Sequence, residues 1–189
     1  EYKIILSTNV AETSITIDDV IGVIDTGRVK EKTYDPHTKL AFLKSTWISK
    51  ASSKQRKGRA GRTAHGTCYK LYSALRAENL DAFQDSELLR MPLEELVLQA
   101  KCLGLANGNK HETGGDSIST FLLKAMDTPH TLAIENALTV CERINCMDRD
   151  ENLTELGHAL SQLPLNPRLG RMILFGCLLG CGSSAVSIA

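Results

Sequence analysis

The stretch that decides the fold is Gln-Arg-Lys-Gly-Arg-Ala-Gly-Arg at residues 55–62. Its last two arginines, Arg59 and Arg62, stand three residues apart with a glycine between them. Glycines let a backbone turn tightly and approach a ligand. Arginine binds phosphate through two parallel hydrogen bonds and keeps its charge at neutral pH. The stretch could therefore neutralise the charge on a phosphoryl group during its transfer. The alternative is a plain basic run for RNA binding or nuclear targeting, which needs no fixed spacing.

A second polar stretch lies upstream, at residues 7–17, with the sequence Ser-Thr-Asn-Val-Ala-Glu-Thr-Ser-Ile-Thr-Ile. It follows the apolar segment Tyr2–Leu6, which predicts a short buried strand. Five hydroxyls, one amide and one carboxylate thus gather just after the carboxyl end of a predicted strand, where open α/β sheets bind ligands. The alternative is an ordinary turn held by local bonds from side chains to backbone.

Charge is distributed unevenly along the chain. The 189 residues carry 22 Lys+Arg and 22 Asp+Glu, so the net charge is zero and a uniformly basic nucleic-acid coat is excluded. Residues 1–75 nevertheless hold 13 basic against 7 acidic residues, and no acidic residue occurs between Asp35 and Glu78. Such segregation indicates a first half that faces a polyanion, or a solvated face whose partner carboxylates lie elsewhere in the fold.

The first half predicts strands separated by loops and one short helix, as in half of an α/β sheet. We expect a strand at Val20–Asp25, a hairpin at Gly27–Trp47, a helix at Ser49–Arg56 and a strand at Gly66–Tyr72.

The second half predicts helices and carries a net negative charge. The predicted helices open at Pro92, span Ile118–Ala125 and Leu132–Ile144, run from a cap at Thr154 to Leu163, and open again at Asn166-Pro167. A polar loop, Ala106–Asp116, separates the first two.

The cysteine pattern indicates a reducing compartment, which is the cytoplasm or the nucleus. None of the six cysteines forms a CxxC pair. Cys177 and Cys181 are expected to share one helix face, but zinc would need two further ligands, so buried free thiols and no metal site are predicted.

No signal peptide opens the chain, which resembles an excised piece of a longer protein. The uncharged segment Met172–Ala189 contains glycines and serines and predicts a buried helix, a loop and another helix rather than a membrane span.

Taken together, residues 7–19 (STNVAETSITIDD, motif V) and 55–62 (QRKGRAGR, motif VI) resemble the corresponding motifs of the DEAH-box ATP-dependent RNA helicases of superfamily 2. Residues 24–36 (IDTGRVKEKTYDP) resemble that family's hairpin strand, and residues 92–105 (PLEELVLQAKCLGL) its winged helix. Residues 153–174 (LTELGHALSQLPLNPRLGRMIL) resemble the entry into its helical ratchet domain. The spellings KEKTYDP and WISKAS are similar to the DExH subgroup that includes the G-quadruplex-resolving and YTH-domain helicases.

The resemblance implies an α/β fold followed by a mainly helical part. Residues 1–84 would be the C-terminal part of a second RecA-like domain, residues 85–155 a winged helix, and residues 156–189 the start of the ratchet domain. It implies a parent enzyme that couples ATP hydrolysis to 3′-to-5′ translocation on RNA and to its unwinding.

The resemblance also assigns residues. Gln55, Arg59 and Arg62 would face the nucleotide phosphates as the catalytic set, the two arginines acting as arginine fingers. The ATP-binding set would be Ser14, which senses the γ-phosphate, Asp18, which contacts the ribose, and Gly58. The RNA-binding set would be Thr8 and Asn9 on the backbone, with Lys30 and Lys32 on the strand-separating hairpin.

Parts of an ATP site are missing from the sequence. It has no GxxxxGK[ST] phosphate loop and no DEAH-type magnesium box, so ATP and Mg²⁺ would be bound mainly by the family's first RecA-like domain. The chain alone is therefore predicted to be inactive. The implied partners are RNA, with DNA or a G-quadruplex as alternatives, the first RecA-like domain and a G-patch-type activator, without a membrane. A catalytically silent RNA-binding or scaffold protein and a DNA helicase remain alternatives; the intact Gln55, Arg59 and Arg62 argue against the scaffold.

Overall fold

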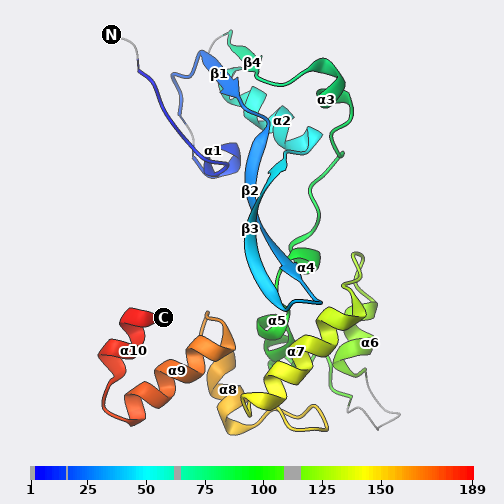
Figure 1. The fold of residues 1–189 in the computed structure, drawn as a ribbon, viewed down its shortest axis with the longest axis vertical. Helices are drawn as coiled ribbons and strands as arrows, with labels where there is room; N and C mark the ends of the chain where they lie inside the picture. The colour runs from blue at the N-terminus through cyan, green and yellow to red at the C-terminus, as the bar shows by residue number, and fades with distance from the viewer. Residues whose placement is uncertain (1–2, 16, 62–64, 109–115) are drawn as a thin grey trace. The chain divides into compact units, whose positions relative to one another are not determined.

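The computed structural model describes residues 3–15, 17–61, 65–108 and 116–189 (Figure 1). The chain divides into two compact units. The first contains Glu1–Thr33 and Phe42–Asp85, and the second Tyr34–Ala41 and Ser86–Ala189.

The first unit is built around a pair of parallel strands. Its elements are α1 (Val10–Thr13), β1 (Gly22–Asp25), β2 (Arg28–Asp35), β3 (Leu40–Trp47), α2 (Lys50–Lys57), the 3₁₀ helix η1 (Gly58–Gly61), β4 (Thr67–Lys70) and α3 (Ala74–Glu78). β1 and β4 pair in register from Gly22 opposite Thr67 to Asp25 opposite Lys70. Figure 1 shows α2 beside this pair, with α1 next to it. The carboxyl end of β1 and the helix of motif VI are thereby brought together.

α2 forms because its amino end is capped and its interior lacks breakers. The Ser49 hydroxyl accepts a hydrogen bond from the Ser52 backbone N–H at 3.1 Å, which satisfies one of the free donors of the first turn. The helix continues directly into η1, which starts at Gly58. The predicted helix at residues 49–56 and its serine cap are confirmed.

β2 and β3 form the predicted hairpin. Its turn is held by Asp35, whose carboxylate accepts bonds from the His37 backbone N–H at 3.0 Å and the Thr38 hydroxyl at 2.8 Å. Both bonds lower the pKa of Asp35, and the bond from the Thr38 hydroxyl has the larger effect. The turn segment Tyr34–Ala41 belongs to the second unit, where the Asn136 side-chain amide donates to the Pro36 carbonyl oxygen at 2.7 Å.

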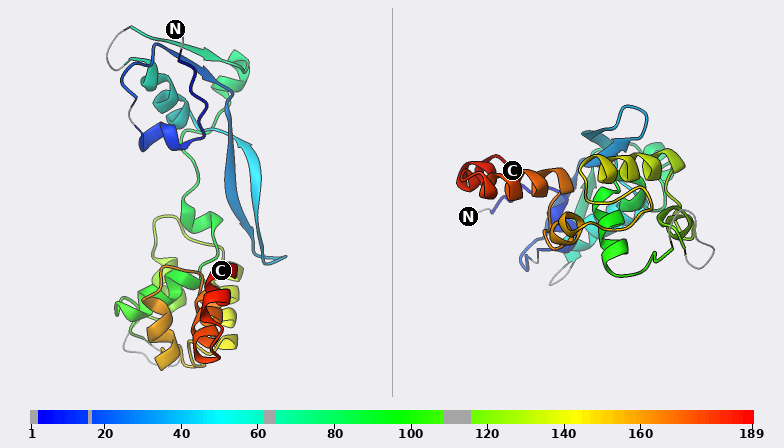
Figure 2. Two further views of the ribbon diagram at one scale, coloured as in Figure 1. Left: turned by 90° about the vertical axis from the view of Figure 1, so that its left-hand side faces the viewer. Right: turned by 90° about the horizontal axis from the view of Figure 1, so that it is seen from below.

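The second unit is helical and holds the larger core. Its elements are α4 (Glu87–Arg90), α5 (Glu94–Cys102), α6 (Ile118–Leu123), α7 (Thr131–Arg143), α8 (Glu155–Ser161), α9 (Pro167–Leu178) and α10 (Gly182–Ile188). The left view of Figure 2 shows the later helices of this unit, from α5 onward, grouped together. The buried side chains of α5, α6, α7 and α8 include Val97, Leu98, Ile118, Ile134 and Leu160. Apolar side chains at helical spacing thus meet in one cluster, as the periodicity predicts.

The predicted caps of the last helices are also present. The Thr154 hydroxyl accepts from the Gly157 backbone N–H at 3.0 Å at the start of α8. Asn166 caps α9 through a 3.0 Å bond from the Arg168 N–H, and Pro167 occupies the first helical turn. Within the described residues, no helix is both long and apolar enough for a membrane span.

Three expectations are wrong. Lys3–Leu6 is not a strand but an extended, exposed segment, because no strand among the described residues pairs with it. The polar stretch Ser7–Ser14 is expected to be a loop from its composition, but it contains the one-turn helix α1. Cys177 and Cys181 do not share a helix face and are exposed, because α9 ends at Leu178.

The coarse fold class, a chain of mixed helices and strands, is confirmed. The domain limits at 84 and 155 and the winged-helix and ratchet assignments stay predictions. Most of the predicted loop at 106–116 lies outside the described residues.

Candidate nucleotide and RNA site

Arg56 connects motif VI to motif V and to the end of β1. Its Nε and Nη2 atoms each lie 2.7 Å from Oε1 of Glu12, and its Nη1 atom lies 2.9 Å from Oδ1 of Asp25. The same Nη1 donates to the Arg28 carbonyl oxygen at 3.2 Å. The three side chains are 15%, 13% and 0% exposed, so this is a largely desolvated network. A planar guanidinium can satisfy two carboxylates at once, which a lysine ammonium does less well.

Asp25 is the buried centre of this network. Its Oδ1 also accepts from the Gly27 backbone N–H at 2.9 Å, and its Oδ2 accepts from the Tyr72 hydroxyl at 3.1 Å. The Tyr72 oxygen lies 2.9 Å from the Ser53 hydroxyl of α2. Each carboxylate oxygen therefore has a donor, as a buried charge requires. One continuous chain of bonds runs from motif V through Asp25 to α2.

The network shifts the pKa values of its members. Burial alone would lower the pKa of Arg56, but its hydrogen bonds to Glu12 and Asp25 outweigh burial and raise the pKa. Burial, reinforced by the charge of Asp25, raises the pKa of Tyr72, while the bond to Ser53 opposes the rise. The guanidinium therefore stays charged and the phenol stays neutral at physiological pH.

Arg59, on η1, also lies against motif V. Its Nη1 donates to the Ile15 carbonyl oxygen at 3.4 Å, and its Nε is buried without a hydrogen-bond partner in the described structure. A buried donor without a partner costs roughly 1–3 kcal/mol. Among the described residues, the Arg59 side chain thus holds unused donor capacity beside motif V.

The other predicted members of motif VI differ in what can be said of them. Arg62 lies outside the described residues. Gln55 is exposed on α2. Gly58 has φ −64°, an ordinary helical value, and its assignment to the ATP-binding set stays a prediction. A Cβ at Gly58 or Gly61 would meet no atom within 4 Å, which leaves open space over this backbone.

The predicted residues of motif V present exposed side chains around α1. Thr8, Asn9 and Ser14 are all exposed, and Asn9 caps α1 without a side-chain bond. The Thr8 hydroxyl makes one local contact, 3.5 Å to the Val10 N–H, at the outer limit of a hydrogen bond. Asp18 is exposed in the turn before β1. Local bonding therefore accounts for little of what these hydroxyls and amides can do.

Lys30 and Lys32 lie on the solvent face of β2. Together with Arg28 they occupy alternate positions, and all three are exposed. Alternate strand residues share one face, so the hairpin presents a basic row. The Arg28 guanidinium carbon sits 3.5 Å from the centre of the Trp47 ring, which fixes the start of the row. No cluster of three or more metal-ligating side chains occurs among the described residues.

Comparison with known proteins shows which sequences this chain resembles. No family model matches the chain. The DExH-box ATP-dependent RNA helicase DExH2 of Arabidopsis thaliana is 48% identical over 187 residues, covering 99% of this chain and 11% of that protein. The ATP-dependent DNA/RNA helicase DHX36 of Homo sapiens is 47% identical, covering 99% of this chain and 18% of its own length. The chain belongs to the DExH-box family. It spans less than a fifth of the length of either relative.

Motif VI of this DExH-box chain contains one structurally important residue, Arg56, that the sequence patterns do not identify as part of the site. Arg56 was not assigned a role, although it makes the closest contacts between motif V and motif VI. A signal was present: Asp25 ends an apolar strand, and a carboxylate in that position needs a cation. Several cations were available in the sequence, so the signal did not say which one.

Proposed function

We propose that this DExH-box chain supplies one wall of an ATP site and part of an RNA channel in an ATP-dependent RNA helicase that moves 3′ to 5′ on RNA. In this proposal residues 1–84 are the C-terminal part of the second RecA-like domain, 85–155 the winged helix and 156–189 the start of the ratchet domain. The observation that carries it is Arg59, whose buried Nε has no hydrogen-bond partner among the described residues while its Nη1 reaches motif V.

The residues fit the phosphate end of ATP but not its metal. Arg59 and the exposed Gln55 would face the phosphates beside the open backbone of Gly58, and Ser14 and Asp18 would complete the nucleotide contacts. The phosphate-loop lysine and the Mg²⁺ ligands would come from the first RecA-like domain. Bound Mg²⁺ would neutralise charge on the phosphates; the part of this chain would be to orient them and to stabilise developing negative charge through guanidinium forks.

Motif V would couple RNA to the nucleotide. Thr8 and Asn9 at the start of α1 would contact the RNA backbone, and Ser14 at its end would sense the terminal phosphate. Because α1 is a single turn, a shift at one end moves the other. Arg56 holds Glu12 within that turn, which ties motif V to motif VI. Lys30 and Lys32 would contact the strand that the hairpin displaces.

A DNA-directed helicase is the second candidate, because the human relative is named a DNA/RNA helicase. Contacts to the phosphate backbone, which dominate this proposal, do not distinguish the two nucleic acids.

The proposal is tested in the helicase that contains this chain. Arg59→Ala should lower kcat for ATP by about 10³–10⁵, the usual value of an arginine finger, with a much smaller loss of RNA affinity. Arg59→Lys should rescue poorly, because a point charge lacks the fork. Arg149→Ala, an exposed arginine of the second unit, is the matched control and should leave kcat unchanged. A loss of RNA affinity with normal kcat would reduce motif VI to a basic patch.

A further inference from the structure

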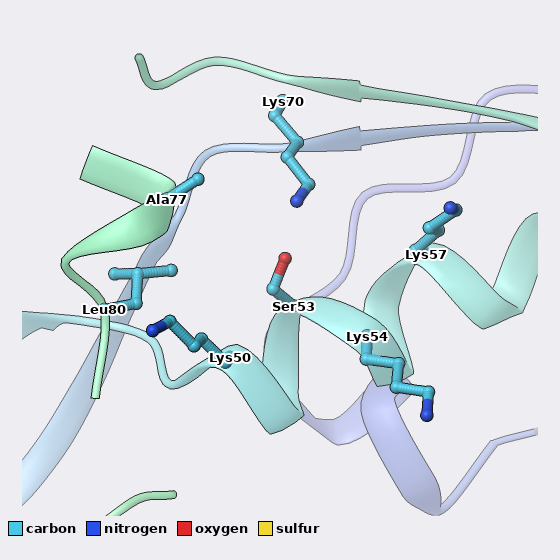
Figure 3. Close-up of a pocket in the computed structure, with 7 residues that line it drawn as sticks. All are labelled: Lys50, Ser53, Lys54, Lys57, Lys70, Ala77 and Leu80. Atoms are coloured by element: carbon cyan, nitrogen blue, oxygen red, sulfur yellow. The ribbon is translucent and has the colours of Figure 1, made fainter. Parts of the chain in front are cut away.

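A hollow of about 190 Å³ opens on the first unit between α2, β4 and α3. Its lining is Lys50, Ser53, Lys54, Lys57, Lys70, Ala77 and Leu80. Figure 3 shows the Lys70 side chain reaching toward Ser53, while the side chains of Lys50, Lys54 and Lys57 extend outward from α2 at the rim of the hollow. Four of the seven lining residues are cationic and none is acidic, so the positive charge in the hollow is not balanced by its own wall.

The three lysines of α2 lie on one helix face by their spacing. Lys50, Lys54 and Lys57 stand at positions i, i+4 and i+7, where like charges repel and destabilise a helix. Lys50 also begins α2, the end at which the helix dipole disfavours a cation, and the first turn holds no acidic residue. Lys54 and Lys57 lie in the last turn, where the helix dipole favours cations, so the uncompensated charge at the start of α2 is that of Lys50.

None of the four lysines has an ion-pair partner among the described residues. The printed neighbour of Lys70 is the Tyr72 ring, 5.7 Å from its Nζ. By contrast, Lys3, Lys101 and Lys124 each pair with a carboxylate. The lysines of the hollow are therefore available to an external anion.

We propose that this hollow binds adjacent phosphate groups of a polyanion. Lysine ammonium groups bind phosphate oxygens as point charges, and four of them match the charge of two or three phosphates. The lining has no aromatic side chain on which a base could stack, so its lysines suit phosphate groups rather than bases. The ligand is thus the phosphate chain of a nucleic-acid backbone or of a free polyphosphate.

The site is separate from the proposed ATP and RNA residues. None of Thr8, Asn9, Ser14, Lys30 or Arg59 lines the hollow. The inference therefore stands or falls independently of the proposed helicase function. Ser53, at the base of the hollow, is bonded to Tyr72 and through it to Asp25, so an anion that orders Ser53 acts on the same bond network as Arg56.

The test places one carboxylate at the mouth of the hollow. Tripolyphosphate is titrated into the 189-residue chain by calorimetry at about physiological salt, where exposed charges farther apart than about 8 Å are screened. The unmodified chain should bind one equivalent. Ala77→Glu, on α3, should weaken binding at least about tenfold by repulsion, whereas the isosteric Ala77→Gln should bind within about twofold of the unmodified chain. Equal affinities of the Glu and Gln variants, or no binding by the unmodified chain, would overturn the proposal.

A second pair of variants removes charge instead of adding it. Lys54→Gln with Lys57→Gln should weaken tripolyphosphate binding about tenfold or more. Lys39→Gln with Lys44→Gln removes the same charge from exposed positions outside the hollow and should change affinity little. Equal losses in both pairs would show general electrostatic attraction and count against a built site. Circular dichroism and thermal melting confirm that every variant remains folded.

Single-stranded RNA identifies the source of the phosphates. If Ala77→Glu weakens RNA binding relative to Ala77→Gln, and tripolyphosphate competes with RNA, the ligand is a nucleic-acid backbone. If only tripolyphosphate distinguishes the two variants, the ligand is a free polyphosphate. If neither ligand distinguishes them, the hollow is not a phosphate site.

Discussion

Arg56 and Glu12 stand 44 residues apart in sequence, and Nε of Arg56 lies 2.7 Å from the Glu12 carboxylate. The same guanidinium reaches Asp25, whose carboxylate is fully buried. One arginine therefore joins the helix of motif VI, the single turn of motif V and the end of β1. The pair explains why motif V can be an exposed turn and still hold a defined position in the first unit.

Loss of Arg56 should destabilise the first unit strongly. Arg56→Met keeps the length of the side chain but leaves Asp25 as a buried, uncompensated charge, which costs about 3–5 kcal/mol. Glu12→Gln removes the more accessible charge and should cost less, because its amide can still accept a bond from Arg56. Urea denaturation of the chain measures both. Asp25→Asn in the Arg56→Met background should recover part of the loss, and a double variant as unstable as the sum of the singles would contradict the coupling.

Gly27 should tolerate no side chain. Its φ of +71° lies in the left-handed region, and a Cβ there would come within 2.6 Å of the Tyr72 ring and 3.2 Å of the Trp47 ring. Gly27→Ala should lower stability by at least about 1–3 kcal/mol through backbone strain and displacement of Tyr72. Gly22→Ala is the matched control, since a Cβ at Gly22 would meet nothing within 4 Å. An equal fall in melting temperature for Gly27→Ala and Gly22→Ala would refute the claim that strain and crowding are specific to Gly27.

Helix caps could be predicted from the sequence, whereas the contacts of Arg56 could not. The caps at Ser49, Thr154 and Asn166 were predictable because a cap depends on three or four consecutive residues. The bonds of Arg56 depend on partners 44 and 31 residues away, which no local pattern specifies. Lys3–Leu6 has the composition of a strand, but a strand also needs a neighbour to pair with. The candidate site was likewise outlined by its motifs, whereas the arginine that holds it together was not.

Alkaline pH should destabilise the first unit partly through Tyr72. Burial raises the pKa of Tyr72 above its usual value of 10.0, so folding favours the neutral phenol. The stability from this shift is fully present below pH 10 and is lost as the pH rises through the raised value. Tyr72→Phe should flatten the decline in melting temperature above pH 10. Burial raises the pKa of Tyr34 as well, so Tyr34→Phe measures the corresponding contribution of a tyrosine in the second unit. An unchanged decline in Tyr72→Phe would exclude the phenol as the titrating group.

The purified chain should hydrolyse no ATP above background. Its sequence contains no phosphate loop, and the described residues contain no cluster of metal-ligating side chains. A phosphate-release assay with and without Mg²⁺ and RNA measures this, with the helicase that contains the chain as the positive control. Turnover by the chain that depends on Mg²⁺ would refute the proposal of a site shared between two domains.

Thr8 and Ser14 should separate RNA binding from its coupling to ATP hydrolysis, in the helicase that contains this chain. Thr8→Ala removes one hydrogen bond to the RNA backbone, worth about 0.5–3 kcal/mol, so RNA affinity should fall modestly and RNA-stimulated ATPase should fall at limiting RNA. Ser14→Ala should leave RNA affinity near normal but reduce the stimulation even at saturating RNA.

The structure provides the control for this pair of variants. Both side chains are exposed, the Thr8 hydroxyl accepts one bond, at 3.5 Å from the Val10 N–H, among the described residues, and the Ser14 hydroxyl lies 3.4 Å from that of Thr13. Because so little is bonded to either hydroxyl, neither substitution should lower the melting temperature by more than the effect of an ordinary surface change, about 0.5 kcal/mol in free energy. If both variants melt early and basal and stimulated ATPase fall together, the two hydroxyls serve the fold. Full stimulation of Ser14→Ala at saturating RNA would rule out its role as the sensor of the terminal phosphate.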